Sequence, residues 1–295
     1  MKRLLLILNP CAGKMKSKTA LFDIVDILCR GPYLVTTQIT THRGHAAELA
    51  RTAAETGHSR IVCCGGDGTL SETVDGNMHA KKPLPIGYIP AGSTNDFAAS
   101  AGIPADPAVA AAMVAAGKPV PLDLGRFGAD RYFTYSASFG AFTAASYSAP
   151  QPAKNRLGHM AYILEGVKDI SKIKPYHVRV EADGAVYEDD YVFGAVCNSV
   201  TMAGMVKFKS DIVDMQDGRL EVVLIKMPAS LADLTQIVHA LPRLDCHNDR
   251  IDLFQAQEIR FTLPEALPWS LDGECADGEQ TVAITTQPGA LQLIK

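Results

Sequence analysis

The sequence predicts an α/β domain with a parallel sheet, followed by a mostly antiparallel, β-rich domain. Up to about residue 120, apolar strand-like runs alternate with helical stretches, which is typical of a parallel sheet with crossover helices. Beyond Pro119 strand-like segments dominate, which favours antiparallel pairing. A chain of 295 residues, 47% of them apolar, is long enough for two globular domains. We place them at residues 1–121 and 122–295, with the C-terminal tail free to pack back on the first domain.

The elements of the first domain follow from runs of apolar residues and from their boundaries. We expect strands at Leu4–Leu8, Tyr33–Ile39, Arg60–Cys64 and Ile86–Ile89. We expect helices at Lys18–Cys29, Gly44–Thr56, Ser71–His79, Asn95–Ala101 and Pro107–Ala116. The last of these is rich in alanine, begins with proline and is closed by Gly117, a typical helix boundary pattern.

The second domain is expected to consist mainly of strands. The strand-like segments are Asp123–Gly125, Tyr132–Ser138, Tyr176–Ala182, Val192–Cys197 and Arg219–Ile225. Helices at about residues 156–171 and 229–241 interrupt them.

Composition excludes several classes of protein. A net charge of −4 argues against a general nucleic-acid-binding protein, which would carry a basic surplus. The apolar run Leu4–Leu8 is shorter than a signal peptide requires, and no segment approaches the roughly 20 apolar residues of a membrane span. Seven cysteines without a Cys-x-x-Cys motif give no disulfide or zinc framework. We therefore expect a cytoplasmic protein without a transmembrane segment.

The most informative motif is Gly65-Gly66-Asp67-Gly68-Thr69, which follows a buried strand. Glycines at a strand end present backbone N–H groups to phosphate oxygens, and the following helix adds its positive N-terminal end. An aspartate in this turn would repel phosphates unless Mg²⁺ lies between them, so the motif favours a metal–nucleotide site. A dinucleotide fingerprint is excluded, because Ser71 stands where its third glycine belongs. A plain turn capped by Asp67 is the alternative.

Polar loops follow three strands of the predicted parallel sheet, at the edge where open α/β sheets bind ligands. The first loop, Asn9–Lys14, offers a lysine to this edge, although it lacks the spacing of a Walker A motif. The second is the glycine turn. The third, Pro90–Phe97, offers hydroxyls, an amide and a carboxylate, and its alternative role is a helix N-cap. Their order suggests a single site.

Together these loops resemble the catalytic family of diacylglycerol kinases, which includes bacterial diacylglycerol kinases and the sphingosine and ceramide kinases. The quoted motifs are Asn9-Pro10-x-x-Gly13-Lys14, Gly65-Gly66-Asp67-Gly68-Thr69, Pro90-x-Gly92-Ser93-x-Asn95-Asp96-Phe97-Ala98 and Leu271-Asp272-Gly273-Glu274. Asp123-Leu124-Gly125 and Gly158-x-x-Ala161-Tyr162 resemble landmarks of the family's second domain, so the resemblance covers nearly the whole chain. Three positions depart from the family pattern, with Ser71 and Asp75 for asparagine and Ser93 for threonine.

The resemblance implies a fold of the NAD kinase and phosphofructokinase type, with the active site in a cleft between the domains. It also implies transfer of the γ-phosphate of ATP to a lipid hydroxyl with Mg²⁺, with diacylglycerol as the expected acceptor and phosphatidic acid as product. The protein would then act peripherally on the inner face of the membrane. Pairing of sheet edges into a homodimer is left open.

The resemblance also assigns roles to residues of this chain. Lys14 is expected to neutralise phosphate charge during catalysis. Nucleotide contacts are expected from Asn9, Thr40, Gly65, Gly66, Asp67, Gly68, Thr69, Ser71, Gly92, Ser93 and Asn95.

Metal and catalytic roles fall on acidic residues. Asp67, Asp96 and Asp123 are expected to hold the catalytic Mg²⁺, since hard cations prefer oxygen ligands. A structural Mg²⁺ is implied at Asp214, Asp217 and Arg219, where a solvated acidic turn is the alternative.

The general base that accepts the proton of the lipid hydroxyl is expected to be Glu274, and Asp67 is its rival. Asp272-Gly273-Glu274 also has the pattern of an ordinary hairpin turn.

Two other functions are alternatives to a lipid kinase. An NAD kinase would carry a later segment rich in Asp, Gly, Ser and Thr, which this sequence lacks. An inactive nucleotide- or lipid-binding regulator would have lost part of the acidic residues named above. Asp67, Asp96, Asp123 and Glu274 are all present. The identity of the lipid acceptor is not encoded in any motif that can be read from the sequence.

Overall fold

The computed structural model describes residues 2–13, 16–140, 174–202, 206–208, 213–241, 244 and 248–295. Lys14, the landmark at Gly158–Tyr162 and the helix expected at 156–171 lie outside these ranges. The chain divides into two compact units. The first contains Met1–Leu124, Arg131–Thr134 and Pro288–Lys295, and the second contains Gly125–Asp130 and Tyr135–Gln287.

The first unit is built on a parallel sheet with the strand order β2-β1-β3-β4-β17. The strands are β1 (Lys2–Leu8), β2 (Tyr33–Ile39), β3 (Arg60–Gly65), β4 (Ile86–Pro90) and the end of β17 (Thr281–Ile294). Every residue of β4 is buried, and so is most of β1 and β3. Continuous burial requires cover on both faces of the sheet, which explains why these strands are unbroken apolar runs.

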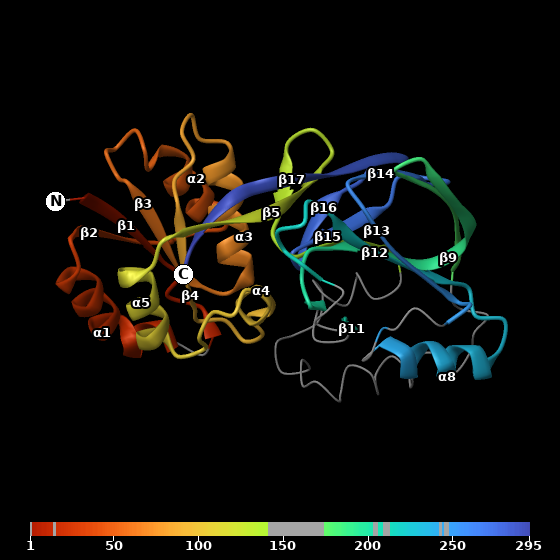
Figure 1. Cartoon of the computed structure of the whole chain (residues 1–295), viewed down its shortest axis with the longest axis horizontal. Coiled ribbons are helices and arrows are strands. Elements are labelled where there is room, and N and C mark those ends of the chain that lie inside the picture. The colour runs from red at the N-terminus through yellow and green to blue at the C-terminus, as the bar shows by residue number, and fades with distance from the viewer. Residues whose placement is uncertain are drawn as a thin grey trace. The chain divides into compact units, whose positions relative to one another are not determined.

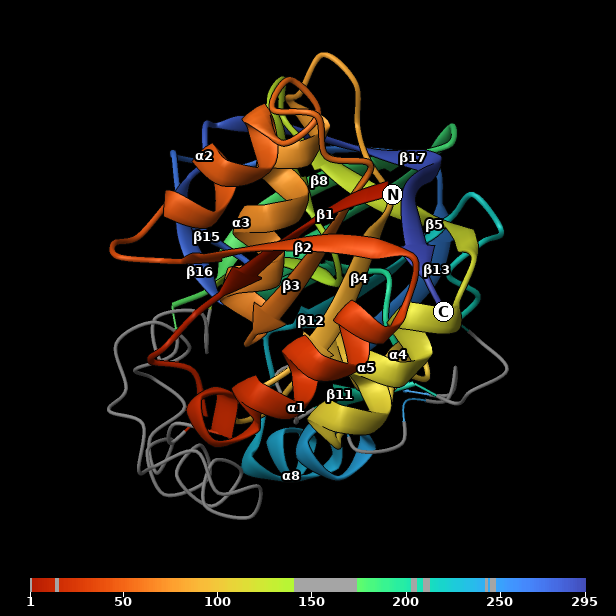
Figure 2. The same cartoon turned by 90° about the vertical axis from the view of Figure 1, so that its left-hand side faces the viewer.

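Helices provide this cover. They are α1 (Lys16–Arg30), α2 (His45–Thr52), α3 (Asp67–Met78), α4 (Asp96–Ser100) and α5 (Pro107–Ala116). Figure 2 shows α2 and α3 on one face of the sheet and α1 and α5 on the other, and the same pairs are in contact. Helix α5 has the expected bounds because Asp106 caps it, accepting hydrogen bonds from the backbone N–H groups of Ala108 and Val109 at 2.9 and 3.0 Å.

The second unit is a largely antiparallel sheet, as predicted. Its strands are the end of β5 (Pro119–Phe127), β7 (Ser136–Gly140), β8 (Tyr176–Ala182), β9 (Ala185–Cys197), β10 (Thr201–Met202), β11 (Val206–Lys207), β12 (Leu220–Lys226), β13 (Ile251–Ala256), β14 (Glu258–Thr262), β15 (Pro268–Leu271), β16 (Glu274–Asp277) and the start of β17. Helix α8 (Leu231–Ala240) is capped by the Ser230 hydroxyl. The single tryptophan, Trp269, is fully buried against Phe127, Phe139 and Phe261.

Strand β17 belongs to both units. Thr281–Thr285 pair antiparallel with β14, whereas Leu293 pairs parallel with Ile86 of β4. Its path can be followed in Figure 1 together with β5, the other strand that contributes to both units. The last eight residues of the chain therefore complete the sheet of the first unit.

Two features differ from the sequence-based expectation. The strand expected at Tyr132–Ser138 is interrupted, giving β6 (Arg131–Phe133) and β7. The reason is that the Asp272 side chain accepts hydrogen bonds from the N–H groups of Tyr135 and Ser136. Residues 251–294 form five strands to which the apolar pattern assigned no element. Strands such as β14 alternate exposed and buried residues over only five positions, so long-range pairing decides them.

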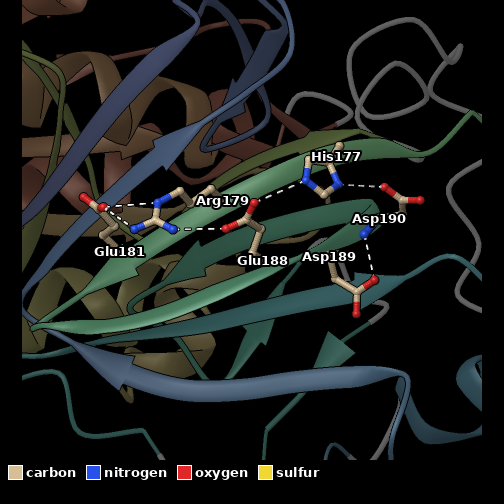
Figure 3. A network of polar contacts seen from close by, with 6 residues as sticks. All are labelled: His177, Arg179, Glu181, Glu188, Asp189 and Asp190. Atoms are coloured by element: carbon tan, nitrogen blue, oxygen red, sulfur yellow. Dashed lines mark hydrogen bonds and ion pairs between the residues drawn. The ribbon is translucent and has the colours of Figure 1, made fainter.

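The exposed face of β8 and β9 carries a ladder of charges (Figure 3). Arg179 pairs with Glu181 at 2.9 Å and with Glu188 at 3.0 Å, and His177 lies 3.0 Å from Asp190 and 3.4 Å from Glu188. Hydrogen bonds to Asp190 and then Glu188 raise the pKa of His177 above its usual value. Exposed pairs of this kind contribute little to stability, although pairs of opposite charge across two strands favour the register in which the strands lie.

Candidate functional site

The three polar loops meet at the carboxyl ends of β1, β3 and β4. Strand β3 lies between the other two, so its glycine turn is the middle loop. The Asn9 N–H donates to the Cys64 carbonyl at 2.9 Å, and the Ala91 N–H donates to the Gly65 carbonyl at 2.7 Å. These bonds extend the sheet one residue beyond its strands and fix the loops side by side. The three loops therefore lie next to one another, and their joint role as one site stays a prediction.

Glycine is required where the loops touch. A Cβ atom on Gly13, which has φ +44°, would lie 1.9 Å from the Ala91 carbonyl oxygen. A Cβ on Gly92 would lie 2.7 Å from the Gly66 Cα. Real side chains do not tolerate such approaches to backbone atoms, so glycine permits backbone from three loops to line one small region.

The glycine turn leads directly into α3. Gly66 is the N-cap residue and has no side chain to cap the helix. Asn9 of the first loop contacts the side chain of Thr69 in the first turn, its Nδ2 donating to Thr69 Oγ1 at 2.9 Å. The first turn of α3 therefore presents backbone N–H groups and its positive end toward this region, an arrangement that suits a phosphate group.

Asp67 is not the N-cap residue of α3, because Gly66 holds that position, whereas the alternative interpretation of the motif made Asp67 the cap. It is the first residue of α3, only 9% exposed, and its Oδ2 accepts hydrogen bonds from the Thr94 hydroxyl and the Asp96 N–H, each at 3.2 Å. The carboxylate therefore joins the glycine turn to the third loop, and it accepts the N–H of Asp96, the first residue of α4.

Asn95 closes the third loop. It adopts a left-handed backbone conformation with φ 54°, and its side chain bridges Gly92, accepting from the N–H at 2.9 Å and donating to the carbonyl at 3.1 Å. The Tyr88 hydroxyl donates to the Gly65 carbonyl at 3.2 Å and lies 3.4 Å from Asn95 Oδ1. Burial and the nearby Asp67 charge raise the pKa of Tyr88 well above its usual value, so this hydroxyl stays protonated.

Thr40 follows β2 and lies at the same edge of the sheet. Its N–H donates to the Leu8 carbonyl at 2.9 Å, so its loop starts beside the first polar loop. The loop is also tied to α3, because the Gly44 N–H donates to Glu72 Oε1 at 2.8 Å. The rings of His42 and His45 stack in this loop with centroids 4.7 Å apart.

Ser71 and Ser93 are two further residues from which nucleotide contacts were predicted, and these contacts stay a prediction. Ser71 lies half-buried in α3, one turn from Asp67, and Ser93 is exposed in the third loop.

The expected three-carboxylate metal site is only partly assembled. Asp96 adjoins Asp67 through its backbone, whereas Asp123 is 2% exposed and accepts a 2.7 Å hydrogen bond from the Gly289 N–H. Among the residues that the structure describes, no group of three or more His, Cys, Asp or Glu side chains is arranged to hold a metal ion. The Mg²⁺ ligand set stays a prediction.

Glu274 belongs to the second unit and is half-buried at the first position of β16. The preceding Asp272 and Gly273 both have positive φ, 50° and 84°, which makes the two-residue turn of the β15–β16 hairpin a type I′ turn. Asp272 is 3% exposed, and its Oδ1 accepts from the N–H groups of Tyr135 and Ser136 at 2.9 and 3.0 Å. The hairpin interpretation of this motif is therefore correct for its backbone, and Asp272 anchors the turn that carries Glu274.

In the acidic turn before β12, two aspartate side chains accept hydrogen bonds from backbone N–H groups of the same turn. Asp214 accepts from the Gln216 N–H at 3.0 Å, and Asp217 accepts from the Arg219 N–H at 2.9 Å. Glu221 lies fully buried at the start of β12, where burial, reinforced by the charges of Asp217 and Asp214, raises its pKa to about 7. The turn is strongly acidic, but the cation expected there stays a prediction.

The structure adds three residues that the motifs did not single out: Glu72, Tyr88 and Thr94. Thr94 stood at a variable position of its motif, and Tyr88 belonged to a buried strand. Each acts through a bond to a residue distant in sequence, so no local pattern could have identified it.

Two models of known protein families match this chain. Residues 3–127 match the model of the diacylglycerol kinase catalytic domain, and residues 136–295 match the YegS C-terminal NAD kinase beta sandwich-like domain. The chain therefore belongs to the diacylglycerol kinase catalytic-domain family of lipid kinases, which confirms the resemblance and the fold class predicted from the sequence.

Several relatives match over nearly their full length. The diacylglycerol kinase of Bacillus subtilis (strain 168) is 30% identical over 93% of this chain and 90% of its own. A Chromohalobacter salexigens protein described as "Probable lipid kinase YegS-like" is 32% identical over 98% and 91%. The crystal structure of a diacylglycerol kinase from Bacillus anthracis str. Sterne superposes with a TM-score of 0.77 over 99% and 96% at 23% identity, and shows the fold. Among the described helices, none has the length and apolar character that crossing a bilayer requires.

Proposed function

We propose that this chain is an ATP- and Mg²⁺-dependent lipid kinase that transfers the γ-phosphate to a lipid hydroxyl, with diacylglycerol as the acceptor and phosphatidic acid as the product. The observation that supports the proposal most strongly is the position of Asp67. Its buried carboxylate lies at the N-terminus of α3, within a turn of backbone N–H groups that suits phosphates. A carboxylate and a phosphate are compatible there only with a cation between them.

The residues present fit a bound nucleotide. Backbone N–H groups of the Gly65–Thr69 turn would bind phosphate oxygens, and the close approach of Gly13, Gly66 and Gly92 leaves no side chains to block them. Thr69 Oγ1 accepts a bond from Asn9, so its proton can be donated to a phosphate. Lys14, Thr40 and Ser93 would add further contacts. When bound, Mg²⁺ would neutralise phosphate charge, with Asp67 as its principal ligand and Asp96 beside it. Asp123, the third expected ligand, belongs to the same unit.

The transfer step requires a base for the lipid hydroxyl. We assign it to Glu274, which the rigid Asp272–Gly273 turn presents at the start of β16. Glu274 would accept the hydroxyl proton while the hydroxyl oxygen bonds to the γ-phosphorus. The bond from that phosphorus to the β–γ bridging oxygen breaks, and ADP leaves. The protein would act at the membrane surface, where the acceptor resides.

The decisive experiment is transfer of radiolabelled γ-phosphate from ATP with Mg²⁺ to a panel of micellar lipids. The panel holds diacylglycerol, monoacylglycerol, phosphatidylglycerol and sphingoid bases, with NAD as an additional acceptor. Labelled phosphatidic acid is the expected product. Label on NAD alone would overturn the lipid assignment, and nucleotide binding without any labelled product would identify a regulator.

Substitution of Glu274 tests the base. Glu274→Gln should lower kcat at least a hundredfold and leave the affinity for MgATP unchanged, because the amide keeps the shape but cannot accept a proton. Glu279→Gln, at an exposed position in the same segment, is the matched control. An unchanged kcat in Glu274→Gln would transfer the role to Asp67.

A further inference from the structure

The bond between Thr94 and Asp67 links two loops of the proposed nucleotide site. Thr94 lies 27 residues after Asp67 in sequence, and its Oγ1 donates to Asp67 Oδ2 at 3.2 Å. The same oxygen accepts the Asp96 N–H at 3.2 Å. Two donors therefore converge on one oxygen of a carboxylate that is only 9% exposed.

The third loop is built to aim the Thr94 hydroxyl. Asn95 takes the left-handed conformation, and its side chain holds both the N–H and the carbonyl of Gly92. These two bonds close residues 92–95 into a ring and restrain the backbone on both sides of Thr94. The Tyr88 hydroxyl supports the ring from the buried strand below. The loop therefore restrains the backbone that carries the Thr94 donor, and the bond to Asp67 orients the hydroxyl.

A carboxylate oxygen accepts about two hydrogen bonds in the plane of the group. The two donors on Oδ2 therefore restrict the orientation of the Asp67 carboxylate. Preorganised ligands matter for Mg²⁺ because its coordination geometry is strict. A ligand free to rotate would have to be ordered during binding, at a cost in affinity.

We propose that Thr94 is a positioning residue, whose hydroxyl orients the Asp67 carboxylate for the cation that accompanies the nucleotide phosphates. The inference rests on the proposed function for its link to Mg²⁺ and ATP. Thr94 stands at a variable position of the third motif, and in this role it does not contact the reacting atoms. The Asp96 N–H is a backbone donor, so Thr94 is the member of the pair that substitution can remove.

Three variants separate the effect of the Thr94 hydroxyl from that of the side-chain shape. Thr94→Val removes the hydroxyl but keeps the β-branched shape, and Thr94→Ser restores the donor. Thr52→Val, at an exposed position on α2, is the matched control for the same substitution. The first measurement is ATP affinity by titration calorimetry over a series of Mg²⁺ concentrations, and without Mg²⁺.

We expect Thr94→Val to weaken Mg²⁺-dependent ATP binding about tenfold, since a hydrogen bond to a charged group is lost. ATP affinity without Mg²⁺ should stay unchanged, and Thr94→Ser and Thr52→Val should resemble the wild-type chain. Unchanged Mg²⁺ dependence in Thr94→Val would overturn the inference. Equal losses in the Val and Ser variants would overturn it too, because they would show that shape and not the hydroxyl matters.

A second measurement needs neither metal nor nucleotide. Urea unfolding of the apo chain is compared for Thr94→Val, Asp67→Asn and the double variant. If the hydroxyl acts through Asp67, the shifts in midpoint should be non-additive, with the double variant close to the more affected single variant. Additive shifts would overturn the coupling. Non-additive shifts in a chain that phosphorylates no lipid would uphold it and reject the proposed function alone.

Discussion

At the scale of single residues, His58 couples folding to pH. It is 8% exposed, and its Nδ1 lies 3.2 Å from the Ala53 carbonyl oxygen. Burial, assisted by the charge of Arg3, lowers its pKa below 6.5 although the Ala53 contact opposes this. The unfolded chain therefore binds this proton more readily than the native chain. The stability contribution is present above pH 6.5 and is lost as pH falls through the lowered native pKa.

We accordingly expect the free energy of unfolding to fall between pH 7.5 and pH 5, and to fall less in His58→Gln. Urea unfolding at fixed ionic strength measures both. Identical pH dependence in the two chains would show that other groups cause the loss.

Asp272 links the residue scale to the element scale, because one carboxylate stabilises a whole hairpin. Asp272→Ala removes the acceptor of two backbone N–H groups and places alanine at a positive φ, so it should destabilise the chain by about 2 kcal/mol or more. Asp272→Asn keeps an acceptor and tolerates this conformation, so most of the stability should return. Trp269, three positions earlier and fully buried, reports unfolding by its fluorescence. Equal losses in both variants would mean that the negative charge is needed.

At the scale of elements, the crossing of α2 and α3 depends on Gly76. A Cβ atom at this position would lie 2.2 Å from the Ala47 carbonyl oxygen and 2.5 Å from its Cα. In an isolated helix, alanine is favoured over glycine by about 1 kcal/mol. Here the clash is with backbone, which cannot rotate away, and overpacking costs about 1 to 3 kcal/mol.

Gly76→Ala should therefore destabilise the chain by about 1 to 2 kcal/mol, despite the better helix propensity. Thermal unfolding followed by circular dichroism measures the effect. A stabilised variant would show that α2 moves aside at little cost. Because α3 carries Asp67 at its first residue, the same displacement should weaken ATP binding.

At the scale of the whole molecule, the end of the chain completes the first unit. Leu291, Leu293 and Ile294 are at most 1% exposed, and Lys295 exchanges backbone hydrogen bonds with Lys118 at 3.1 and 3.2 Å. Burial of three such side chains contributes about 1.5 to 3 kcal/mol each. Deleting residues 288–295 should destabilise the first unit by about 5 kcal/mol or more.

Hydrogen exchange read peptide by peptide checks this expectation. Protection should fall at β4 and α5, which lie far from the deletion in sequence. Exchange at the β15–β16 hairpin should change less, because that hairpin belongs to the second unit. A uniform loss in both units would show that they unfold together.

Local chemistry alone determined much of this protein. Strand-like runs predicted four strands of the first unit, and proline, aspartate and glycine at its ends defined α5. The glycine turn with Asp67 indicated a phosphate and metal site, and four motifs in order indicated the family. These features depend on side-chain type and backbone φ within a few residues, which a sequence displays directly.

Only the tertiary structure decided what distant residues do together. It brought hydrogen-bond donors to three carboxylates from residues 27 to 166 positions away in sequence. The donors are Thr94 and Asp96 for Asp67, Gly289 for Asp123, and Tyr135 for Asp272. It also paired β17 with both β14 and β4, which no apolar pattern had indicated. Such bonds depend on strand register and on close approach between loops, and these are set by the packing of the whole sheet. The sequence therefore determined which chemical groups are present, and packing determined which of them meet.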